Sequence, residues 1–211
     1  MICISIGNIE QLEALKGYRH DMVELRYDLI KKSPSELMPL VEYGTKVIAT
    51  CRPGNLTSEH RMQILKESID RGAAYIDLEI ESDTTYINEL ISYAKEHATE
   101  VIISWHALNR TPTKEEIEEK LHECYKKGAD VAKIASMVHD EKDIANLLSL
   151  YALKGRKVVL GMGEKGKISR IAASYLGAEF TFVSLDAGKE TAPGQLTMNE
   201  FAALKKILEP K

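Results

Sequence analysis

Short apolar, β-branched runs alternate along the whole chain with stretches in which apolar residues recur at helical spacing. Runs of the first kind predict buried strands, and stretches of the second kind predict amphipathic helices. The expected strands cover 2–7, 22–28, 46–52, 75–80, 100–106, 130–137, 157–163 and 180–185. The helices expected after them cover 8–16, a stretch opening at 33, 58–71, 84–97, 113–127, 141–153, 167–176 and 197–208.

Local signals mark the ends of these elements. Ser33 and Glu36 form a capping-box pattern with Pro34 at the first helical position, and Thr113 and Glu116 repeat the box. A glycine stands where each of six helices should end, a place that favours a left-handed backbone. These glycines are Gly17, Gly44, Gly72, Gly128, Gly155 and Gly177.

Strict alternation of strand and helix implies a parallel sheet. Eight such units indicate closure into a (β/α)8 TIM barrel, and no Pro-, Ser- or Gly-rich linker divides the chain, so 1–211 is predicted to form a single catalytic domain. The alternative is a doubly wound open sheet. Against it, the first strand–helix turn lacks a glycine-rich dinucleotide fingerprint.

Composition narrows the functional classes. The net charge of -4 argues against a nucleic-acid-binding module, which is usually basic. No apolar stretch approaches the ~18 residues of a membrane span, and the N-terminus lacks the features of a signal peptide. Cys3, Cys51 and Cys124 are odd in number and widely spaced, and the six histidines lack ligand spacing. We therefore expect a cytoplasmic protein without a metal.

Ionisable residues gather at the carboxyl ends of the expected strands, where barrel enzymes place their active sites. They are Glu24, Arg26, Asp28, Arg52, Asp77, Glu79, His106 and Lys133. Because side chains alternate along a strand, Glu24, Arg26 and Asp28 should share one face. Any one of these residues can instead cap a strand or form a salt bridge, but five consecutive strands contributing at one end indicate a site.

Lys133 lies in the middle of an apolar strand. Lysine is rarely fully buried unless it is paired or functional, and burial disfavours its charged form. A neutral amine can attack a carbonyl and form a Schiff base. The alternative is a lysine that extends outward between the helices.

His106 ends the strand that precedes the strand of Lys133. Neighbouring strands lie about 4.8 Å apart, so the two side chains can flank one reacting centre. Imidazole suits general acid–base catalysis near neutral pH. A hydrogen-bonded core histidine is the alternative.

Two loops add candidate binding groups. Gly163 and Gly166 lie in a loop that enters a helix and can hold an anion, and Arg170 can bind a carboxylate in a bidentate manner. Thr191 and Gln195 flank a Pro-Gly turn that can form a hydroxyl-binding lid. Ordinary loops and turns are the alternative for both segments.

In this order the motifs resemble type I 3-dehydroquinate dehydratase along essentially the whole chain. The motifs are Val23-Glu24-Leu25-Arg26-Tyr27-Asp28, Thr50-Cys51-Arg52, Ile76-Asp77-Leu78-Glu79, Ser104-Trp105-His106, Ala132-Lys133-Ile134-Ala135, Met162-Gly163-x-x-Gly166-x-x-Ser169-Arg170 and Ala192-Pro193-Gly194-Gln195. The resemblance implies dehydration of 3-dehydroquinate to 3-dehydroshikimate, the third step of the shikimate pathway, by a homodimer without metal or organic cofactor.

The resemblance also implies residue roles, with Lys133 as the Schiff-base lysine and His106 as the general acid–base. The substrate-binding residues would be Ser5, Glu24, Arg26, Arg52, Arg170, Thr191 and Gln195. The family's usual serine is Thr191 here. Many members carry Glu-Gly-Gly after the strand-three arginine, where this chain has Pro53-Gly54-Asn55-Leu56. The acid that orients His106 is then missing or replaced, by Glu79 or Glu59.

Two other functions remain open from the residues alone. A Schiff-base aldolase on the same fold would need a phosphate cradle after strands seven and eight, which the loop of Gly163 and Gly166 can supply. A barrel without activity could serve as a binding protein or scaffold, but the presence of both Lys133 and His106 argues against it.

Overall fold

Parallel strands alternate with helices throughout the computed structural model, which describes residues 1–17 and 20–208. The strands are β1 (Ile2–Ile6), β2 (Met22–Arg26), β3 (Lys46–Thr50), β4 (Tyr75–Glu79), β5 (Glu100–Ala107), β6 (Val131–Met137), β7 (Lys157–Met162), β8 (Thr181–Ser184) and β9 (Leu196–Thr197). The α-helices are α1 (Ile9–Ala14), α2 (Tyr27–Ile30), α3 (Pro34–Leu37), α4 (Ser58–Asp70), α5 (Thr84–Glu96), α6 (Lys114–Lys126), α7 (Glu141–Ser149), α8 (Lys167–Leu176) and α9 (Met198–Leu208). Four short 3₁₀ turns, η1 (Leu15–Gly17), η2 (Met38–Leu40), η3 (Leu150–Ala152) and η4 (Glu164–Gly166), complete the order.

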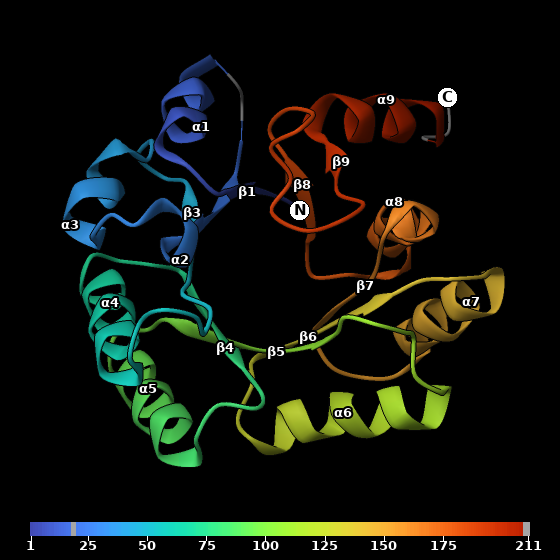
Figure 1. The fold of residues 1–211 in the computed structure, drawn as a ribbon, viewed down its shortest axis with the longest axis horizontal. Helices are drawn as coiled ribbons and strands as arrows, with labels where there is room; N and C mark the ends of the chain where they lie inside the picture. The colour runs from blue at the N-terminus through green and yellow to red at the C-terminus, as the bar shows by residue number, and fades with distance from the viewer. Residues whose placement is uncertain (18–19, 209–211) are drawn as a thin grey trace.

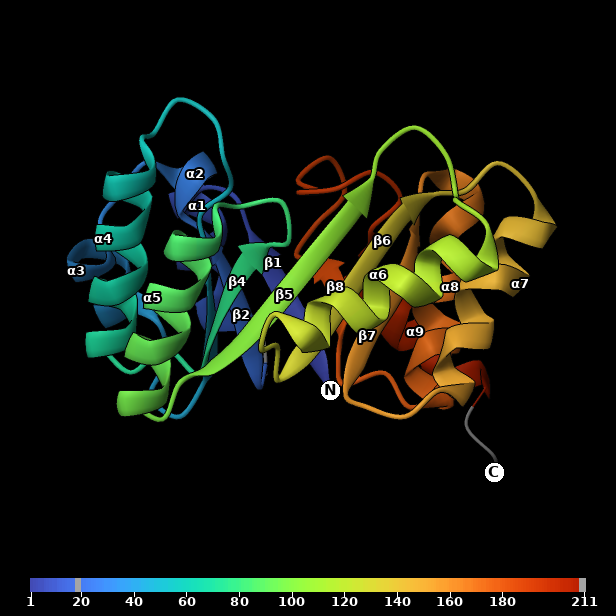
Figure 2. The same ribbon diagram turned by 90° about the horizontal axis from the view of Figure 1, so that it is seen from below.

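The strands curve into a barrel with the helices outside it (Figure 1). Strands β1 to β7 follow one another in sequence order, and β8 pairs with the other edge of β1. Seen from the side, the strands run in one direction, with helices on both flanks (Figure 2). The predicted eight-unit barrel is confirmed, and the doubly wound sheet is excluded because the strand order never reverses.

The seam between β7 and β8 is the weakest join of the barrel. Within 1–17 and 20–208, no strand ladder connects these two strands. A single backbone bond spans the seam near its lower end, where the amide of Glu179 donates to the carbonyl of Lys157 at 3.0 Å. Leu160 and Met162 of β7 and Phe182 of β8 belong to the same hydrophobic cluster inside the barrel.

The alternation of side chains divides each strand between two environments. One face packs against the helices and is apolar, as with Val23 and Leu25 on β2. The other face points into the barrel. Its lower part is apolar, with Met22, Ile48 and Val131 among its members, whereas the part nearer the carboxyl ends is polar. The barrel therefore has a hydrophobic floor beneath a polar chamber.

Several predicted boundaries are correct and several are wrong. Both capping boxes form, from Ser33 with Glu36 and from Thr113 with Glu116. Five of the six expected glycines have a left-handed backbone, while η1 ends at Gly17. These five are Gly44, Gly72, Gly128, Gly155 and Gly177.

Two strands, β2 and β3, end two residues earlier than the sequence predicted. Strand β2 stops at Arg26 because the chain turns directly into α2, so Asp28 does not share the strand face of Glu24. Strand β3 stops at Thr50, and Arg52 follows it in the loop. The short strand β9 was not predicted, because two residues carry no periodicity.

The approach of α8 to β7 depends on two glycines. A Cβ atom on Gly166 would lie 2.5 Å from the carbonyl carbon of Gly161 and 2.7 Å from its oxygen, which are backbone atoms. The Ser169 hydroxyl bridges the same pair, accepting from the Gly161 amide at 2.7 Å and donating to the Gly166 carbonyl at 2.6 Å. This contact fixes the first turn of α8, which carries Arg170.

Replacing Gly166 by alanine should therefore destabilise the fold. The added methyl group must push α8 away from β7, and overpacking of this kind costs about 1–3 kcal/mol. Urea unfolding would measure the loss. Gly54→Ala is the matched control, since nothing lies within 4 Å of the added atom; its effect should stay within about 0.5 kcal/mol. Equal stability of the two variants would contradict the packing argument.

Candidate active site

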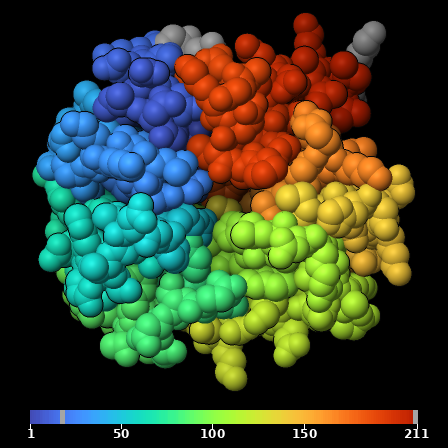
Figure 3. All heavy atoms as spheres, viewed as in Figure 1, coloured from blue at the N-terminus to red at the C-terminus, as the bar shows by residue number. Residues whose placement is uncertain are grey.

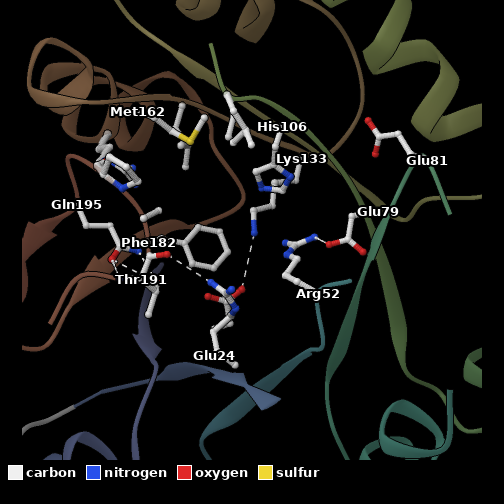
Figure 4. A pocket seen from close by; sticks show the side chains of 17 residues that line it. Glu24, Arg52, Glu79, Glu81, His106, Lys133, Met162, Phe182, Thr191 and Gln195 are labelled. Atoms are coloured by element: carbon white, nitrogen blue, oxygen red, sulfur yellow. Dashed lines mark hydrogen bonds and ion pairs between the residues drawn. The ribbon is translucent and has the colours of Figure 1, made fainter. Parts of the chain in front are cut away.

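A cavity of about 460 Å³ opens at the carboxyl ends of the strands. Figure 3 shows this face of the molecule, which is hollowed near its centre. All of the predicted site residues except Ser5 line the cavity, namely Glu24, Arg26, Arg52, His106, Lys133, Arg170, Thr191 and Gln195 (Figure 4). They come from β2, β5, β6, α8 and the loops after β3 and β8, so the fold brings together residues far apart in the sequence.

Lys133 points into the chamber and is only 6% exposed. Its Nζ donates to Oδ2 of Asp77 at 2.7 Å and lies 3.8 Å from Oε1 of Glu24. The amine also lies 4.1 Å from the centroid of the Phe182 ring. The alternative of an outward lysine is wrong, because the register of β6 turns residue 133 inward. The two carboxylates beside this amine were not part of the sequence argument for Lys133.

Asp77 joins Lys133 to Arg52. Its Oδ2 accepts from NH2 of Arg52 at 2.7 Å as well as from Lys133, and its Oδ1 accepts from the Ser104 hydroxyl at 2.6 Å. Burial alone would raise the pKa of Asp77, but the charges of Arg52 and Lys133 outweigh it and hold this pKa well below its usual range. Asp77 is therefore a permanent anion that holds two cations in place.

Glu24 is held by hydroxyl groups on the two neighbouring strands. The Thr50 hydroxyl donates to Oε1 at 2.9 Å, and the Ser5 hydroxyl donates to Oε2. Ser5 in turn accepts from the Thr191 hydroxyl at 2.7 Å. Ser5 does not line the cavity itself. Its hydroxyl connects Glu24 to Thr191 in the loop after β8.

His106 lies on the same inward face of β5 as Ser104, one inward position nearer the cavity mouth. Burial lowers the pKa of His106 well below its usual value, and the charges of Arg52 and Lys133 lower it further. The imidazole is therefore neutral at pH 7 and can accept a proton.

Neither acid suggested as the orienting partner of His106 performs that role here. Glu79 gives one carboxylate oxygen to Arg52 at 2.6 Å and the other to Arg61 at 3.0 Å. Glu59 is exposed in the first turn of α4. Across residues 1–17 and 20–208, no carboxylate lies within salt-bridge distance of the imidazole.

Arg170 is the least compensated charge in the chamber. It is 1% exposed, and within the described ranges it has no acidic partner. Its NH2 makes one long bond of 3.4 Å to the carbonyl of Pro193, and its Nε is unsatisfied. Burial lowers the pKa of Arg170 to about 10, so it remains a cation at neutral pH. A buried, unpaired guanidinium is a ready site for an anionic group of a ligand.

The loop between β8 and β9 covers one side of the cavity. Gly194, at φ +72°, packs so tightly that a Cβ atom would lie 2.2 Å from the carbonyl oxygen of Gly163. The Gly163 amide donates to Pro193 at 3.1 Å, and Gln195 accepts from the Thr191 amide at 2.8 Å. The loop is thus docked against the segment that leads into α8.

Arg26 faces the same loop. Its guanidinium binds Asp28 through two bonds, of 3.0 and 2.7 Å, and reaches the carbonyl of Thr191 at 3.4 Å. Asp28 occupies this position because it lies in α2 rather than on the strand. Asp28 therefore orients Arg26 instead of entering the cavity.

Several residues of the site were not assigned a role from the sequence. Ser104 and Thr50 bind the carboxylates, Phe182 lies beneath the amine, and Arg61 reaches Glu79 from α4. Strand alternation could have found Ser104 and Phe182, because each is an even number of residues from an inward-facing position. Helical spacing could have shown that Arg61 is buried, because it lies four residues before Leu65 and eight before Ile69, but not that it reaches Glu79.

Residues 1–17 and 20–208 contain no group of three or more His, Cys, Asp or Glu side chains arranged to hold a metal ion. None of their helices is both long enough and apolar enough to cross a membrane.

Comparisons with known proteins agree with this geometry. The family described as type I 3-dehydroquinase matches residues 5–210. The 3-dehydroquinate dehydratases of Desulfotalea psychrophila and Methanocaldococcus jannaschii are 32% and 30% identical, over 96% and 100% of this chain and the same shares of their own lengths.

Solved structures give the same result. The 3-dehydroquinate dehydratase of Aquifex aeolicus VF5 aligns with a TM-score of 0.86 at 30% identity, covering 100% of both chains. The type I enzyme of Clostridium difficile with covalent modified comenic acid aligns with a TM-score of 0.86 at 27% identity, covering 98% of this chain and 91% of its own. A 3-hexulose-6-phosphate synthase, at 15% identity and a TM-score of 0.65, shares the fold alone. On the match over 5–210 and on relatives at 30% identity or more along nearly the whole chain, this protein belongs to the type I 3-dehydroquinase family.

Proposed function

We propose that this chain dehydrates 3-dehydroquinate to 3-dehydroshikimate through a Schiff base on Lys133. The observation that carries the proposal is a buried amine, 2.7 Å from Asp77, in a cavity that also contains a neutral imidazole and an unpaired arginine. The relatives named above support the substrate, and the covalently modified ligand of the C. difficile enzyme is consistent with covalent chemistry in the family.

The first half of the reaction forms the imine. The nitrogen of Lys133 attacks the substrate ketone, and the two protons that this nitrogen loses leave with the ketone oxygen as one water molecule. The protonated imine withdraws electrons from the neighbouring carbon and acidifies its C–H bond. Asp77 and Glu24 remain beside the nitrogen, so the positive charge of the iminium replaces that of the ammonium without a new buried charge.

The second half moves protons. His106, neutral at pH 7, removes the acidified proton and leaves an enamine. The enamine expels the hydroxyl group on the adjacent carbon, which leaves as water with the proton that His106 returns. Water then hydrolyses the product imine and regenerates Lys133.

Arg170 binds the substrate carboxylate in this scheme, since it is the buried cation without an anion. Glu24, Arg26, Arg52, Thr191 and Gln195 line the remaining walls and bind the hydroxyl groups. Ser5 acts indirectly by holding Glu24 and Thr191. The polar chamber therefore matches a small polyhydroxylated carboxylate.

Family membership bears on the alternative functions that the sequence left open. The relatives are dehydratases, which argues against a sugar-phosphate aldolase and against a barrel without activity. We further propose that 1–211 is one catalytic domain, because the family match spans 5–210. The cytoplasmic location and the homodimer stay predictions, the latter from the family resemblance.

Lys133→Met should abolish dehydration. Methionine keeps the length of the side chain but has no amine, so the imine cannot form. Turnover is measured by the rise in ultraviolet absorbance as the product gains a conjugated double bond. Lys154→Met, which removes an exposed lysine, is the control and should retain full activity. Wild-type turnover by folded Lys133→Met would refute the proposal.

Arg170→Met should weaken ligand binding without weakening the fold. A charge-assisted bond is worth about 1.5–3 kcal/mol, so the affinity for 3-dehydroshikimate should fall roughly ten- to hundredfold. Loss of an uncompensated buried charge should leave the free energy of unfolding unchanged or higher. Calorimetry and thermal unfolding measure the two effects, with exposed Arg110→Met as the control. An affinity within twofold of wild type would reject this role for Arg170.

A further inference from the structure

Arg61 lies on α4 and is almost completely buried at 5% exposure, on the same helix face as the core residues Leu65 and Ile69. Its Nε donates to the backbone carbonyl of Cys51 at 2.8 Å, and its NH2 donates to Oε2 of Glu79 at 3.0 Å. The guanidinium also lies 5.2 Å from the centroid of the Tyr86 ring. Three separate contacts thus hold one side chain whose helix is outside the barrel.

These contacts place Arg61 at the outer end of a chain of alternating charges. Glu79 accepts from Arg61 on one oxygen and from Arg52 on the other, at 3.0 and 2.6 Å. Arg52 continues to Asp77 at 2.7 Å, and Asp77 binds Lys133 at 2.7 Å. Between the two ends of the chain, Glu79, Arg52 and Asp77 each have an opposite charge on both sides. The position of Arg52 in the cavity therefore depends on the orientation of Glu79.

Arg52 needs such support because of its place in the chain. It lies beyond the last residue of β3, so no strand ladder fixes its backbone. Pro53 and Gly54 follow it in the loop. Arg61 binds the carbonyl of the residue just before Arg52 and the carboxylate that holds the Arg52 guanidinium. It does not line the cavity that contains Lys133.

We propose that Arg61 is a positioning residue for substrate binding, acting on Arg52 through Glu79. This inference rests on the proposed dehydratase function, in which Arg52 binds a substrate hydroxyl. Without Arg61, one oxygen of a buried carboxylate loses its partner, and Glu79 can turn toward that side or admit water. Arg52 then loses its fixed orientation, while the contact of Lys133 with Asp77 is retained.

The test compares steady-state kinetics with 3-dehydroquinate across four variants. Arg61→Gln should raise KM about tenfold, the size expected when one charge-assisted contact is lost, and change kcat by less than about threefold. In a Glu79→Gln background the same substitution should raise KM by about twofold or less, because residues that act through one contact are not additive. Arg61→Lys keeps the charge but not the two-armed geometry, and its KM should lie between those of wild type and Arg61→Gln.

The control is Arg71→Gln. Arg71 follows the last turn of the same helix and pairs with Glu67 at 3.0 Å on the surface, so its loss removes the same charge and should leave KM unchanged. A merely structural Arg61 would lower stability but leave the KM of the folded fraction near the wild-type value. That result, or an undiminished effect in the Glu79→Gln background, would overturn the inference.

The outcomes separate this inference from the function on which it rests. A wild-type chain without dehydratase activity would overturn the proposed function and this inference with it. An active wild type with a normal KM in Arg61→Gln would overturn the inference alone. Should Arg61→Gln fail to fold, Arg61→Lys decides instead, and a wild-type KM in that variant would overturn the role of Arg61.

Discussion

The pairing of Lys133 with Asp77 is the interaction on which the chamber depends. A lysine ammonium inside a barrel is costly unless opposite charge lies beside it, and here one carboxylate oxygen serves both Lys133 and Arg52. The other charged residues of the chamber are arranged around this pair. Each carboxylate around Lys133 is shared with a second cation or with hydroxyl groups, so the network is balanced throughout its length. Its members are Glu24, Arg52, Arg61, Asp77, Glu79 and Lys133.

A buried charge network of this kind adds little to the stability of the fold, because well-packed apolar groups would stabilise it at least as much. The apolar floor of the barrel and the outer layer against the helices supply the core instead. The residues of the polar chamber can therefore serve ligand binding and catalysis instead of the stability of the fold. Arg170 illustrates this most clearly, because it is buried at a cost in free energy and only a bound anion would offset that cost.

The sequence predicted the periodic parts of this structure well. Alternation turned Glu24, Lys133 and His106 inward, and the order of strands followed from the repeated β–α unit. The sequence-based prediction failed at single residues whose position does not follow from strand or helix periodicity. Asp28 looked like a strand residue because the turn into α2 carries no glycine or proline signal. The contact of Arg61 with Glu79 was not predicted, because Glu79 comes from a strand that is distant from Arg61 in the sequence. Contacts of this kind require three-dimensional proximity, which no spacing rule supplies.

The central claim is that Lys133 performs the covalent step and His106 the proton transfers. The most direct measurement incubates wild type and His106→Ala with 3-dehydroquinate, adds borohydride, and maps the adduct by peptide mass spectrometry. The account predicts an adduct on Lys133 in both proteins, with product formation lowered by several powers of ten in His106→Ala. An adduct on another lysine, no adduct in either protein, or normal turnover in His106→Ala would contradict it.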